Sequence, residues 1–421
     1  MTKPTQHAAG SNLLLDGLGP MLTHADAMLA MSYVPPLPTN VEQVPRHQRL
    51  LQVQDVRDFH FSPPVEAQLQ QSTYMMAWQG YRHRDPRAAS TWATVSGEAQ
   101  RQGMLLQSPI AACVEGLSGV GKTQACLRSL RCFPSQVVEH ASFPKLNGAH
   151  RQVVWLSVEV PPSGKAADLA RALMEAWDRA TGSDRFRIWL EKERIRDGMR
   201  ALDEWRQVAV SHFLGVLHLD EIQNLFKITS LRKRRSGVGD GAPELSIVED
   251  QLLRWLLYLT NSGQVPLLVS GTPDGVGALT KRMSTLQRIN TGGYHAIERL
   301  RWEDIGAKLS TSFLGQLGRY QYVKHPLPMD ENLARLILDL TGGIQRIVIA
   351  LWITAHRIAL ARKEDTLRIE DFQKAAATWL RPLQPAIEAL REASPAKLAR
   401  YEDLVSQDPT FWAALWDGTN R

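Results

Sequence analysis

The chain has 421 residues, of which 44% are hydrophobic, and a formal net charge of +6. This length indicates two or three domains, and the hydrophobic share is ordinary for a soluble globular protein. The charge favours acidic partners but is too small to establish nucleic-acid binding by itself. The three cysteines form no C-x-x-C pair, and the sequence shows neither a secretion signal nor a stretch long enough to span a bilayer. We therefore expect a cytoplasmic protein without a membrane partner.

The first 64 residues predict an N-terminal arm rather than a core, because glycine and proline interrupt them and residues 33–38 favour an extended run. Such an arm would bind a partner or a neighbouring subunit, and a poorly ordered tail is the alternative. A helical pattern follows over residues 65–80 and ends at Gly80. The aromatic and basic side chains of residues 80–86 either line a nucleotide site or pack on the surface.

Residues 116–123 read G-x-x-x-x-G-K-T, the pattern of a phosphate-binding loop. The apolar run before them predicts a buried strand, and the residues after them predict a helix whose N-terminus adds its dipole to the anion site. Lys122 would contact the β- and γ-phosphates of ATP, and the Thr123 hydroxyl would hold Mg²⁺. This context favours nucleotide binding over an ordinary glycine turn. The predicted nucleotide-binding residues are Gly116, Leu117, Ser118, Gly119, Val120, Gly121, Lys122 and Thr123.

A second apolar strand, predicted at residues 213–219, runs directly into two carboxylates. Asp220 would hold Mg²⁺ together with Thr123, and Glu221 would orient and deprotonate the attacking water. His218 lies within this strand and is interpreted as a hydrogen-bonded core histidine rather than a ligand. A further strand at residues 266–272 ends in Ser270 and Thr272, which would either sense the γ-phosphate or form a plain strand-to-turn junction.

Residues 331–380 carry helical patterns throughout and predict a small helical domain. The segment after them contains Trp412 and Trp416, whose spacing suits a helical face that docks either on a partner or on the protein's own core.

The order of phosphate loop, Asp220-Glu221, Ser270-Gly271-Thr272 and helical domain resembles the AAA+ ATPases. Within them the chain is similar to the TnsC/TniB regulators of Tn-seven-like transposons, on residues 80–86, 117–123, 219–223 and 268–274. The resemblance covers residues 65–380. It implies an α/β AAA+ P-loop NTPase core with a parallel sheet at 65–325 and a small all-helical lid domain at 326–380. An N-terminal arm at 1–64 and a partner-docking C-terminal tail at 381–421 would flank them.

The resemblance implies an ATP- and Mg²⁺-dependent ATPase of a bacterial cytoplasm that oligomerises with itself on duplex DNA. It would link target-selection proteins to a transposase. Arg346 would be a lid arginine at the γ-phosphate, and Arg282 or Arg288 would act on the neighbouring subunit's nucleotide. Basic residues before Asp220 would line a DNA-binding pore, although a solvated helix face explains them nearly as well, and the basic loop 232–235 is a further candidate. The pore-lining candidates are Arg185, Arg187, Lys192, Arg194, Arg196 and Arg200.

Two other functions fit the same sequence. A helicase loader or origin-recognition ATPase would carry a DNA-binding module such as a winged helix after the lid, and the roughly forty residues there are few for one. A signalling or scaffold NTPase would act without DNA, and its ATP hydrolysis would not respond to DNA.

Overall fold

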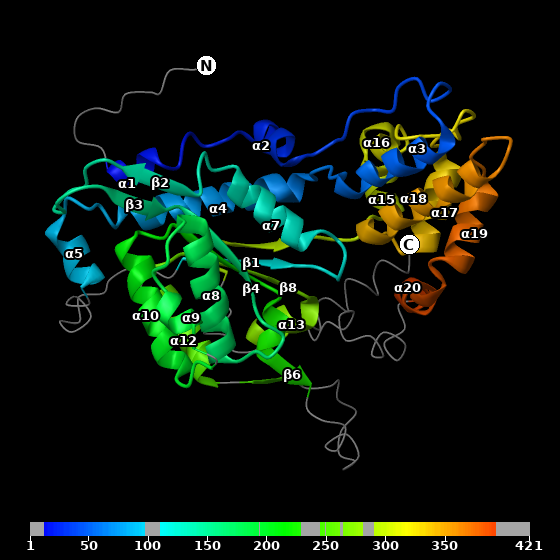
Figure 1. Ribbon diagram of the computed structural model, residues 1–421. Coiled ribbons are helices and arrows are strands. Elements are labelled where there is room, and N and C mark those ends of the chain that lie inside the picture. The colour runs from blue at the N-terminus through cyan, green and yellow to red at the C-terminus, as the bar shows by residue number, and fades with distance from the viewer. Residues whose placement is uncertain are drawn as a thin grey trace, which may run out of the picture. The chain divides into compact units, whose positions relative to one another are not determined.

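The computed structural model describes residues 12–96, 110–192, 194–228, 245–248, 250–261, 264–280 and 290–392 (Figure 1). The chain divides into two compact units, which are described separately. Unit 1 comprises Met1–Ala27, Pro64–Glu115 and Thr123–Ala296. Unit 2 comprises Met28–Pro63, Gly116–Lys122 and Ile297–Arg421.

Unit 1 is built on a five-stranded sheet whose neighbouring strands all pair in parallel, in the order β4-β5-β8-β1-β9. The central strands are almost entirely buried, as apolar strands covered on both faces must be. The predicted parallel α/β core is therefore confirmed. The strands are β1 (Ala111–Glu115), β4 (Trp155–Glu159), β5 (Val216–Asp220), β8 (Leu267–Gly271) and β9 (Gly293–Ala296).

Three helices pack with the sheet into the larger apolar core of unit 1: α8 (Ala166–Thr181), α10 (Gly198–Ser211) and α12 (Asp250–Asn261). Three tryptophan rings, one from each helix, lie in this core. The Trp177 and Trp205 rings are 6.4 Å apart, and the Trp205 and Trp255 rings are 6.3 Å apart. The short helix α9 (Arg187–Leu190) lies between α8 and α10 in the chain.

The helix α4 (Pro64–Arg82) contacts β1, β5 and β9. The remaining elements of unit 1 surround this framework. They are α1 (Leu13–Asp16), α5 (Ala89–Val95), α7 (Lys122–Arg131, whose first residue belongs to unit 2), the hairpin β2 (Val137–His140) and β3 (His150–Val153), η2 (Ile222–Leu225), the hairpin β6 (Phe226–Ile228) and β7 (Leu245–Ile247), and α13 (Pro273–Thr280).

Two side chains of the aromatic and basic segment at residues 80–86, Tyr81 and Arg84, are buried, whereas Arg82 and His83 are exposed. Tyr81 is fully buried, and the Arg84 guanidinium donates to the carbonyl oxygens of Gly80 at 2.9 Å and Leu214 at 3.0 Å. Burial lowers the pKa of Arg84 to about 10, against the opposing effect of Tyr81. Helix α4 also continues past Gly80 to Arg82. These two side chains therefore belong to the core of unit 1 and line neither a nucleotide site nor a surface.

Unit 2 is helical, as the sequence predicts for its C-terminal region. Asp330 caps α17 by accepting a hydrogen bond from the Leu333 backbone at 2.8 Å. The elements are α3 (Arg46–Gln52), η1 (Val53–Asp58), α15 (Trp302–Ile305), η3 (Gly306–Thr311), α16 (Phe313–Leu317), α17 (Glu331–Thr341), α18 (Gln345–Ala361), α19 (Ile369–Thr378), η4 (Arg381–Leu383) and α20 (Gln384–Glu392), while α2 (His24–Met31) spans the junction between the units.

No single helix of the described chain has the length and apolarity to cross a membrane. Helices α17 and α18 are long and apolar enough only when they are taken together, and they are bent by 115° relative to each other.

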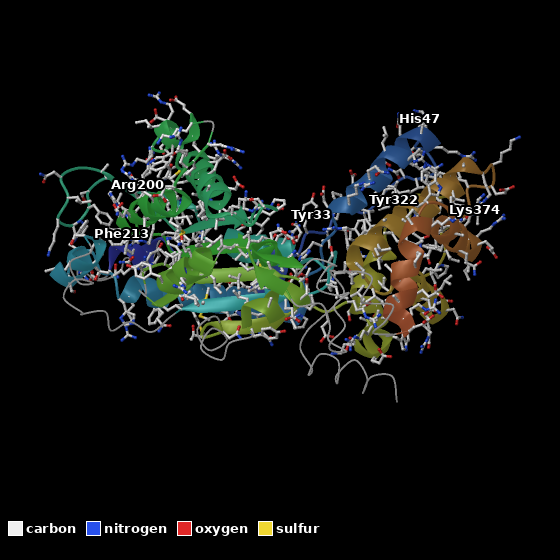
Figure 2. All side chains as sticks on the ribbon, turned by 90° about the horizontal axis from the view of Figure 1, so that it is seen from below. Tyr33, His47, Arg200, Phe213, Tyr322 and Lys374 are labelled. Atoms are coloured by element: carbon white, nitrogen blue, oxygen red, sulfur yellow. The ribbon has the colours of Figure 1, made fainter. Side chains whose placement is uncertain are left out.

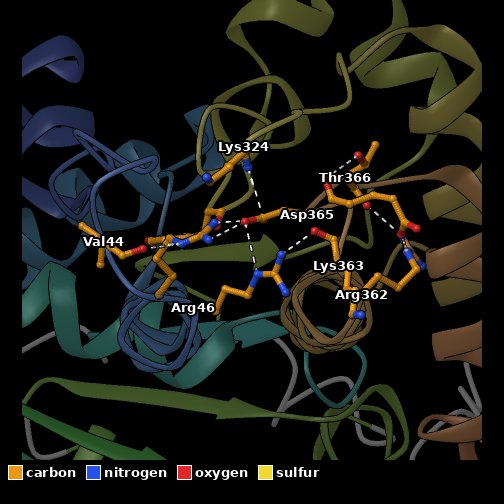
Figure 3. A network of polar contacts seen from close by, with 10 residues as sticks. Val44, Arg46, Lys324, Arg362, Lys363, Asp365 and Thr366 are labelled. Carbon is orange, nitrogen blue, oxygen red and sulfur yellow. Dashed lines mark hydrogen bonds and ion pairs between the residues drawn. The ribbon is translucent and has the colours of Figure 1, made fainter.

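Part of the expected N-terminal arm is core. Val53, Val56 and Phe59 are buried in the apolar cluster that holds Trp352 of α18. The Arg49 guanidinium is 2% exposed and lies 2.5 Å from an oxygen of the buried Asp365 carboxylate (Figure 3). Sequence reasoning assigned these residues to an arm because glycine and proline interrupt the first 64 residues. It missed the buried positions because they fall in two short helices, α3 and η1, whose apolar partners lie far away in the chain.

Candidate nucleotide-binding site

The phosphate loop depends on three glycines. Gly119 and Gly121 have φ angles of 85° and 103°, in the region that residues with a side chain rarely adopt. At Gly116 an added Cβ would lie only 2.5 Å from the Ile297 carbonyl oxygen. Lys122 is buried, and its Nζ donates to the Leu117 carbonyl oxygen at 3.1 Å. The backbone and the lysine together give the tight loop that phosphate binding requires.

Within unit 2, Arg346 lies beside this loop. Its backbone N–H donates to the Gly119 carbonyl oxygen at 3.0 Å, and an added Cβ on Gly119 would lie 3.3 Å from the Arg346 Cβ. The arginine is the second residue of α18 and its side chain is exposed. The structure thus brings the predicted lid arginine and the predicted phosphate loop together, and the arginine's role toward a γ-phosphate stays a prediction.

In unit 1, the Asp220 carboxylate holds two hydroxyl groups. It is the last residue of β5 and is 5% exposed. The Thr123 Oγ1 donates to Asp220 Oδ2 at 2.6 Å, and the Ser270 Oγ donates to the other oxygen, Oδ1. Three of the predicted site residues therefore meet at the carboxyl ends of β5 and β8. Ser270 contacts the carboxylate, so its hydroxyl serves the expected Mg²⁺ ligand directly.

His218 extends this contact through the sheet. Its Nε2 lies 2.8 Å from the Ser270 Oγ, and its Nδ1 lies 2.8 Å from the Ser157 Oγ on β4. Burial lowers the pKa of the imidazole to about 4, although the Asp220 charge opposes that shift. The prediction of a hydrogen-bonded core histidine is confirmed, because both ring nitrogens have partners.

Glu221 lies in a different environment from its neighbour. It immediately precedes η2 and has a left-handed backbone (φ 54°). It is half-buried, and its carboxylate accepts a hydrogen bond from the Gln223 side-chain amide. The Gln223 Oε1 in turn accepts the Thr272 backbone N–H at 3.2 Å. Gln223 thereby connects Glu221 to the end of β8. Sequence reasoning assigned it no role, although it lies within residues 219–223, which carry part of the resemblance.

The Thr272 hydroxyl differs from that of Ser270 in its hydrogen bonding. It is buried, and it has no hydrogen-bond partner among the residues that the structure describes. Burying a hydroxyl without a partner costs free energy, so such groups mark positions where a ligand or a water would complete the bonding. Sensing of the γ-phosphate by Thr272 stays a prediction.

The residues present fit a magnesium ion. Mg²⁺ prefers oxygen ligands, and it is usually bound by one or two protein oxygens together with water and substrate phosphates. A threonine hydroxyl and a carboxylate oxygen already lie 2.6 Å apart at the end of β5. Thr123 and Asp220 would hold the ion.

The predicted DNA-binding residues are all exposed: Arg185, Arg187, Lys192, Arg194, Arg196 and Arg200. They lie in and around α9 and the start of α10, and Figure 2 shows Arg200 among the side chains of this part of unit 1. The Arg187 guanidinium lies 3.5 Å from both Asp184 and Glu191, which partly neutralise it. The Lys192 ammonium lies 4.1 Å from the centre of the Trp189 ring. The basic surface is thus diluted by acids around Arg187.

Several predictions fall outside the described residues. These are the two candidate trans arginines Arg282 and Arg288, the basic loop 232–235, and Trp412 and Trp416 of the tail.

The parallel sheet, the glycine loop between β1 and α7, and the carboxylate at the end of β5 define a P-loop NTPase fold. Residues 107–279 match the model of the AAA domain family.

No curated protein matches the chain in sequence. Solved structures that the chain matches include a Walker-type ATPase of Pyrococcus abyssi, which is 14% identical with a TM-score of 0.39 over 74% of this chain and 79% of that chain. The Orc1 protein of Aeropyrum pernix in complex with DNA is 18% identical with a TM-score of 0.42, over 70% of this chain and 67% of that chain. At these TM-scores the two matches carry no argument about fold or function.

Proposed function

We propose that this protein hydrolyses ATP and uses the hydrolysis as a conformational and assembly switch. The observation that carries the proposal is the meeting of the Thr123 hydroxyl and the Asp220 carboxylate at 2.6 Å, with Glu221 next in the chain. The fold does not by itself require Thr123, which ends the phosphate loop, to contact Asp220, which ends a strand. Their meeting is expected where both hold one cation beside a bound triphosphate.

Each group has a defined task in this reaction. The loop amides and Lys122 bind the phosphates, and Thr123 and Asp220 hold Mg²⁺, which would neutralise charge on the phosphate oxygens. Glu221 orients the attacking water and accepts its proton. Gln223 holds the Glu221 carboxylate through its amide. Arg346 is the candidate for stabilising the charge that develops on the γ-phosphate.

The specific function that we propose is regulation of DNA transposition. The protein would assemble with itself on duplex DNA and link target-selection proteins to a transposase. Support comes from the likeness of residues 80–86, 117–123, 219–223 and 268–274 to the TnsC/TniB regulators. The exposed basic residues around α9 add a surface on which phosphate contacts are possible.

Steady-state ATP hydrolysis, measured with and without duplex DNA at fixed low salt, tests the proposal. We expect hydrolysis that needs Mg²⁺ and that rises when duplex DNA is added. ATP hydrolysis that is indifferent to DNA would instead favour the scaffold NTPase, and absence of hydrolysis in both conditions would refute the ATPase itself. Transposase genes beside the gene for this protein would support the transposition role in particular.

A further inference from the structure

We propose that His218 is a positioning residue for ATP hydrolysis: acting through Ser270, it holds the Asp220 carboxylate in the orientation that meets Thr123. The inference rests on the proposed ATPase function, which supplies the reason why the orientation of Asp220 matters. No hydrogen bond joins His218 directly to Asp220 or Thr123 among the residues that the structure describes, so we assign its effect to the bonds that run through Ser270. The chain of contacts runs from Ser157 through His218 and Ser270 to Asp220.

The strand register places all four side chains on one face of the sheet. Ser157 on β4 is the direct register partner of His218 on β5, and His218 is opposite Leu268 on β8. Side chains alternate between the two faces along each strand, so Asp220 and Ser270, each two residues further on, share that face. The neighbouring residues Leu217 and Leu219 point the other way, into the apolar core with α8 and α10.

The ionised Asp220 carboxylate determines the donor and the acceptor of every hydrogen bond between Ser157, His218, Ser270 and Asp220. An ionised carboxylate only accepts, so the single Ser270 hydroxyl proton goes to Asp220 Oδ1. The Ser270 oxygen must then accept from His218, which puts the ring proton on Nε2. The Nδ1 of the neutral ring is left as an acceptor for the Ser157 hydroxyl. One arrangement of protons satisfies all the groups, and each group has a partner despite being largely removed from water.

This series of hydrogen bonds fixes the terminal side-chain torsion of Asp220, which would otherwise rotate easily. The terminal torsion of an aspartate side chain has a broad, roughly two-fold profile, so hydrogen bonds to its oxygens decide the plane of the carboxylate. Ser270 fixes Oδ1 and thereby aims Oδ2 at the Thr123 hydroxyl. Without His218, the Ser270 oxygen would lose the donor on its far side, and the hydrogen bond from Ser270 to Asp220 would hold the carboxylate plane less firmly. Hydrogen-bond partners behind metal ligands typically contribute about 10–100-fold to metal affinity.

Three variants separate this role from a purely structural one. His218→Leu removes both ring hydrogen bonds and places an apolar side chain at this buried strand position. His218→Gln keeps an amide that can donate toward Ser270. His295→Leu is the matched control, because His295 also lies in a strand of unit 1 and bonds a serine, Ser72, at 3.1 Å, without a link to Asp220.

The first measurement is Mg²⁺ binding to the full-length protein with a non-hydrolysable ATP analogue, followed by nucleotide fluorescence during Mg²⁺ titration. We expect the Mg²⁺ concentration at half-saturation to rise about 10–100-fold in His218→Leu, to rise less in His218→Gln, and to stay at the parent value in His295→Leu. The Mg²⁺ dependence of ATP hydrolysis should shift in the same order. Thermal melting followed by circular dichroism checks that each variant is folded.

Parent-like Mg²⁺ affinity in a folded His218→Leu protein would overturn the inference, and so would an equal loss in His295→Leu, since that would mean general destabilisation. If His218→Leu does not fold, the same titration on Ser270→Ala decides. The Mg²⁺ concentration at half-saturation must then rise, because Ser270 is the link between His218 and Asp220, and a parent-like value would overturn the inference. A parent protein that binds Mg²⁺ and nucleotide but does not hydrolyse ATP would refute the proposed function while leaving the binding test of His218 intact.

Discussion

At the scale of single residues, two adjacent carboxylates have separate surroundings. Asp220 is buried and accepts hydrogen bonds from two hydroxyl groups, whereas Glu221 is half-buried at a positive φ angle and accepts from the Gln223 amide. A buried carboxylate with fixed hydroxyls suits a metal ligand, and a partly accessible one suits a base that exchanges a proton with water. The backbone turn at Glu221 is what separates the two, because it takes the chain out of the sheet.

Replacing Glu221 by Gln tests the base. We expect ATP binding to persist and turnover to fall by on the order of a hundredfold or more, because a general base typically contributes that much. Pre-steady-state and steady-state hydrolysis measure the rate, and equilibrium titration with a fluorescent nucleotide measures binding. Lys122→Ala is the contrasting variant and should weaken nucleotide binding itself. Unchanged turnover in Glu221→Gln would remove this residue from the mechanism.

At the scale of elements, hydrogen bonds and ion pairs join α3 to the segment before α19 within unit 2 (Figure 3). Arg49 donates to both oxygens of Asp365 and to the Tyr322 carbonyl oxygen at 2.7 Å, and the Lys324 backbone N–H also donates to Asp365 at 3.3 Å. Arg46 adds a second, more exposed cation at 3.6 Å. Two segments more than 300 residues apart in the chain are thus joined by one buried ion pair.

Removing one member of the Arg49–Asp365 pair should lower the stability of the protein. We expect Arg49→Met to lower the free energy of unfolding by about 3–5 kcal/mol, because Asp365 would remain buried as a charge without its main partner. The double variant Arg49→Met/Asp365→Asn should recover part of this loss, since asparagine tolerates the φ of 54° at this position and carries no charge. Urea unfolding followed by circular dichroism measures both. Glu331→Gln, which breaks the exposed pair with Arg335, is the control and should change little.

The same pair predicts a pH dependence. Burial acts to raise the pKa of Asp365, but the hydrogen bond and charge of Arg49 outweigh it and hold that pKa below the usual value. A carboxyl whose pKa is lowered on folding stabilises the protein above its unfolded pKa, and this contribution disappears as the pH falls through the folded value. The stability gap between the parent and the double variant should therefore shrink on acidification below about pH 4. A gap that widened there would contradict the assignment.

The basic segment around α9 carries the DNA prediction. We expect Lys192→Ala/Arg194→Ala to lower the affinity for unrelated duplex sequences alike, because phosphate contacts position a protein without reading bases. The slope of log affinity against log salt should become shallower by about 0.9 for each phosphate that the variant no longer neutralises. Arg335→Ala/Lys374→Ala removes the same charge from exposed positions of unit 2 and is the matched control. Fluorescence anisotropy across a salt series measures the DNA affinity of both double variants. An unchanged slope in Lys192→Ala/Arg194→Ala would mean that DNA binds at another surface.

At the scale of the whole molecule, the predicted site residues come from both compact units. The loop glycines, Lys122 and Arg346 belong to unit 2, and Thr123, Asp220, Glu221 and Ser270 belong to unit 1.

Assembly is tested by the candidate trans arginines. We expect Arg282→Ala or Arg288→Ala, whichever removes the trans arginine, to bind ATP yet lose hydrolysis by roughly a thousandfold. Mixing that variant with Glu221→Gln should restore some activity, because a mixed interface can combine an intact arginine with an intact base. ATP hydrolysis as a function of the mixing ratio measures this. Full activity in both single variants would place the trans residue elsewhere in the chain.

The sequence by itself determined the parts that local patterns encode. The phosphate loop needs glycines at fixed spacing, β5 is an apolar run that ends in Asp220, and the helices after residue 330 have an apolar face at helical spacing. Each of these signals lies within a short window, so the parallel sheet, the helical region and the pairing of Thr123 with Asp220 could be predicted without a structure.

Only the tertiary structure decided which distant segments meet. The alternation of side chains predicts that His218 and Asp220 share a face, but the strand order β4-β5-β8 is what puts Ser157 and Ser270 on either side of the histidine. Likewise, Arg49 and Arg84 look like solvated cations until folding surrounds them with carbonyl oxygens and, for Arg49, the Asp365 carboxylate. Periodicity reports the face of one element, whereas burial of a polar group depends on partners that are remote in the chain.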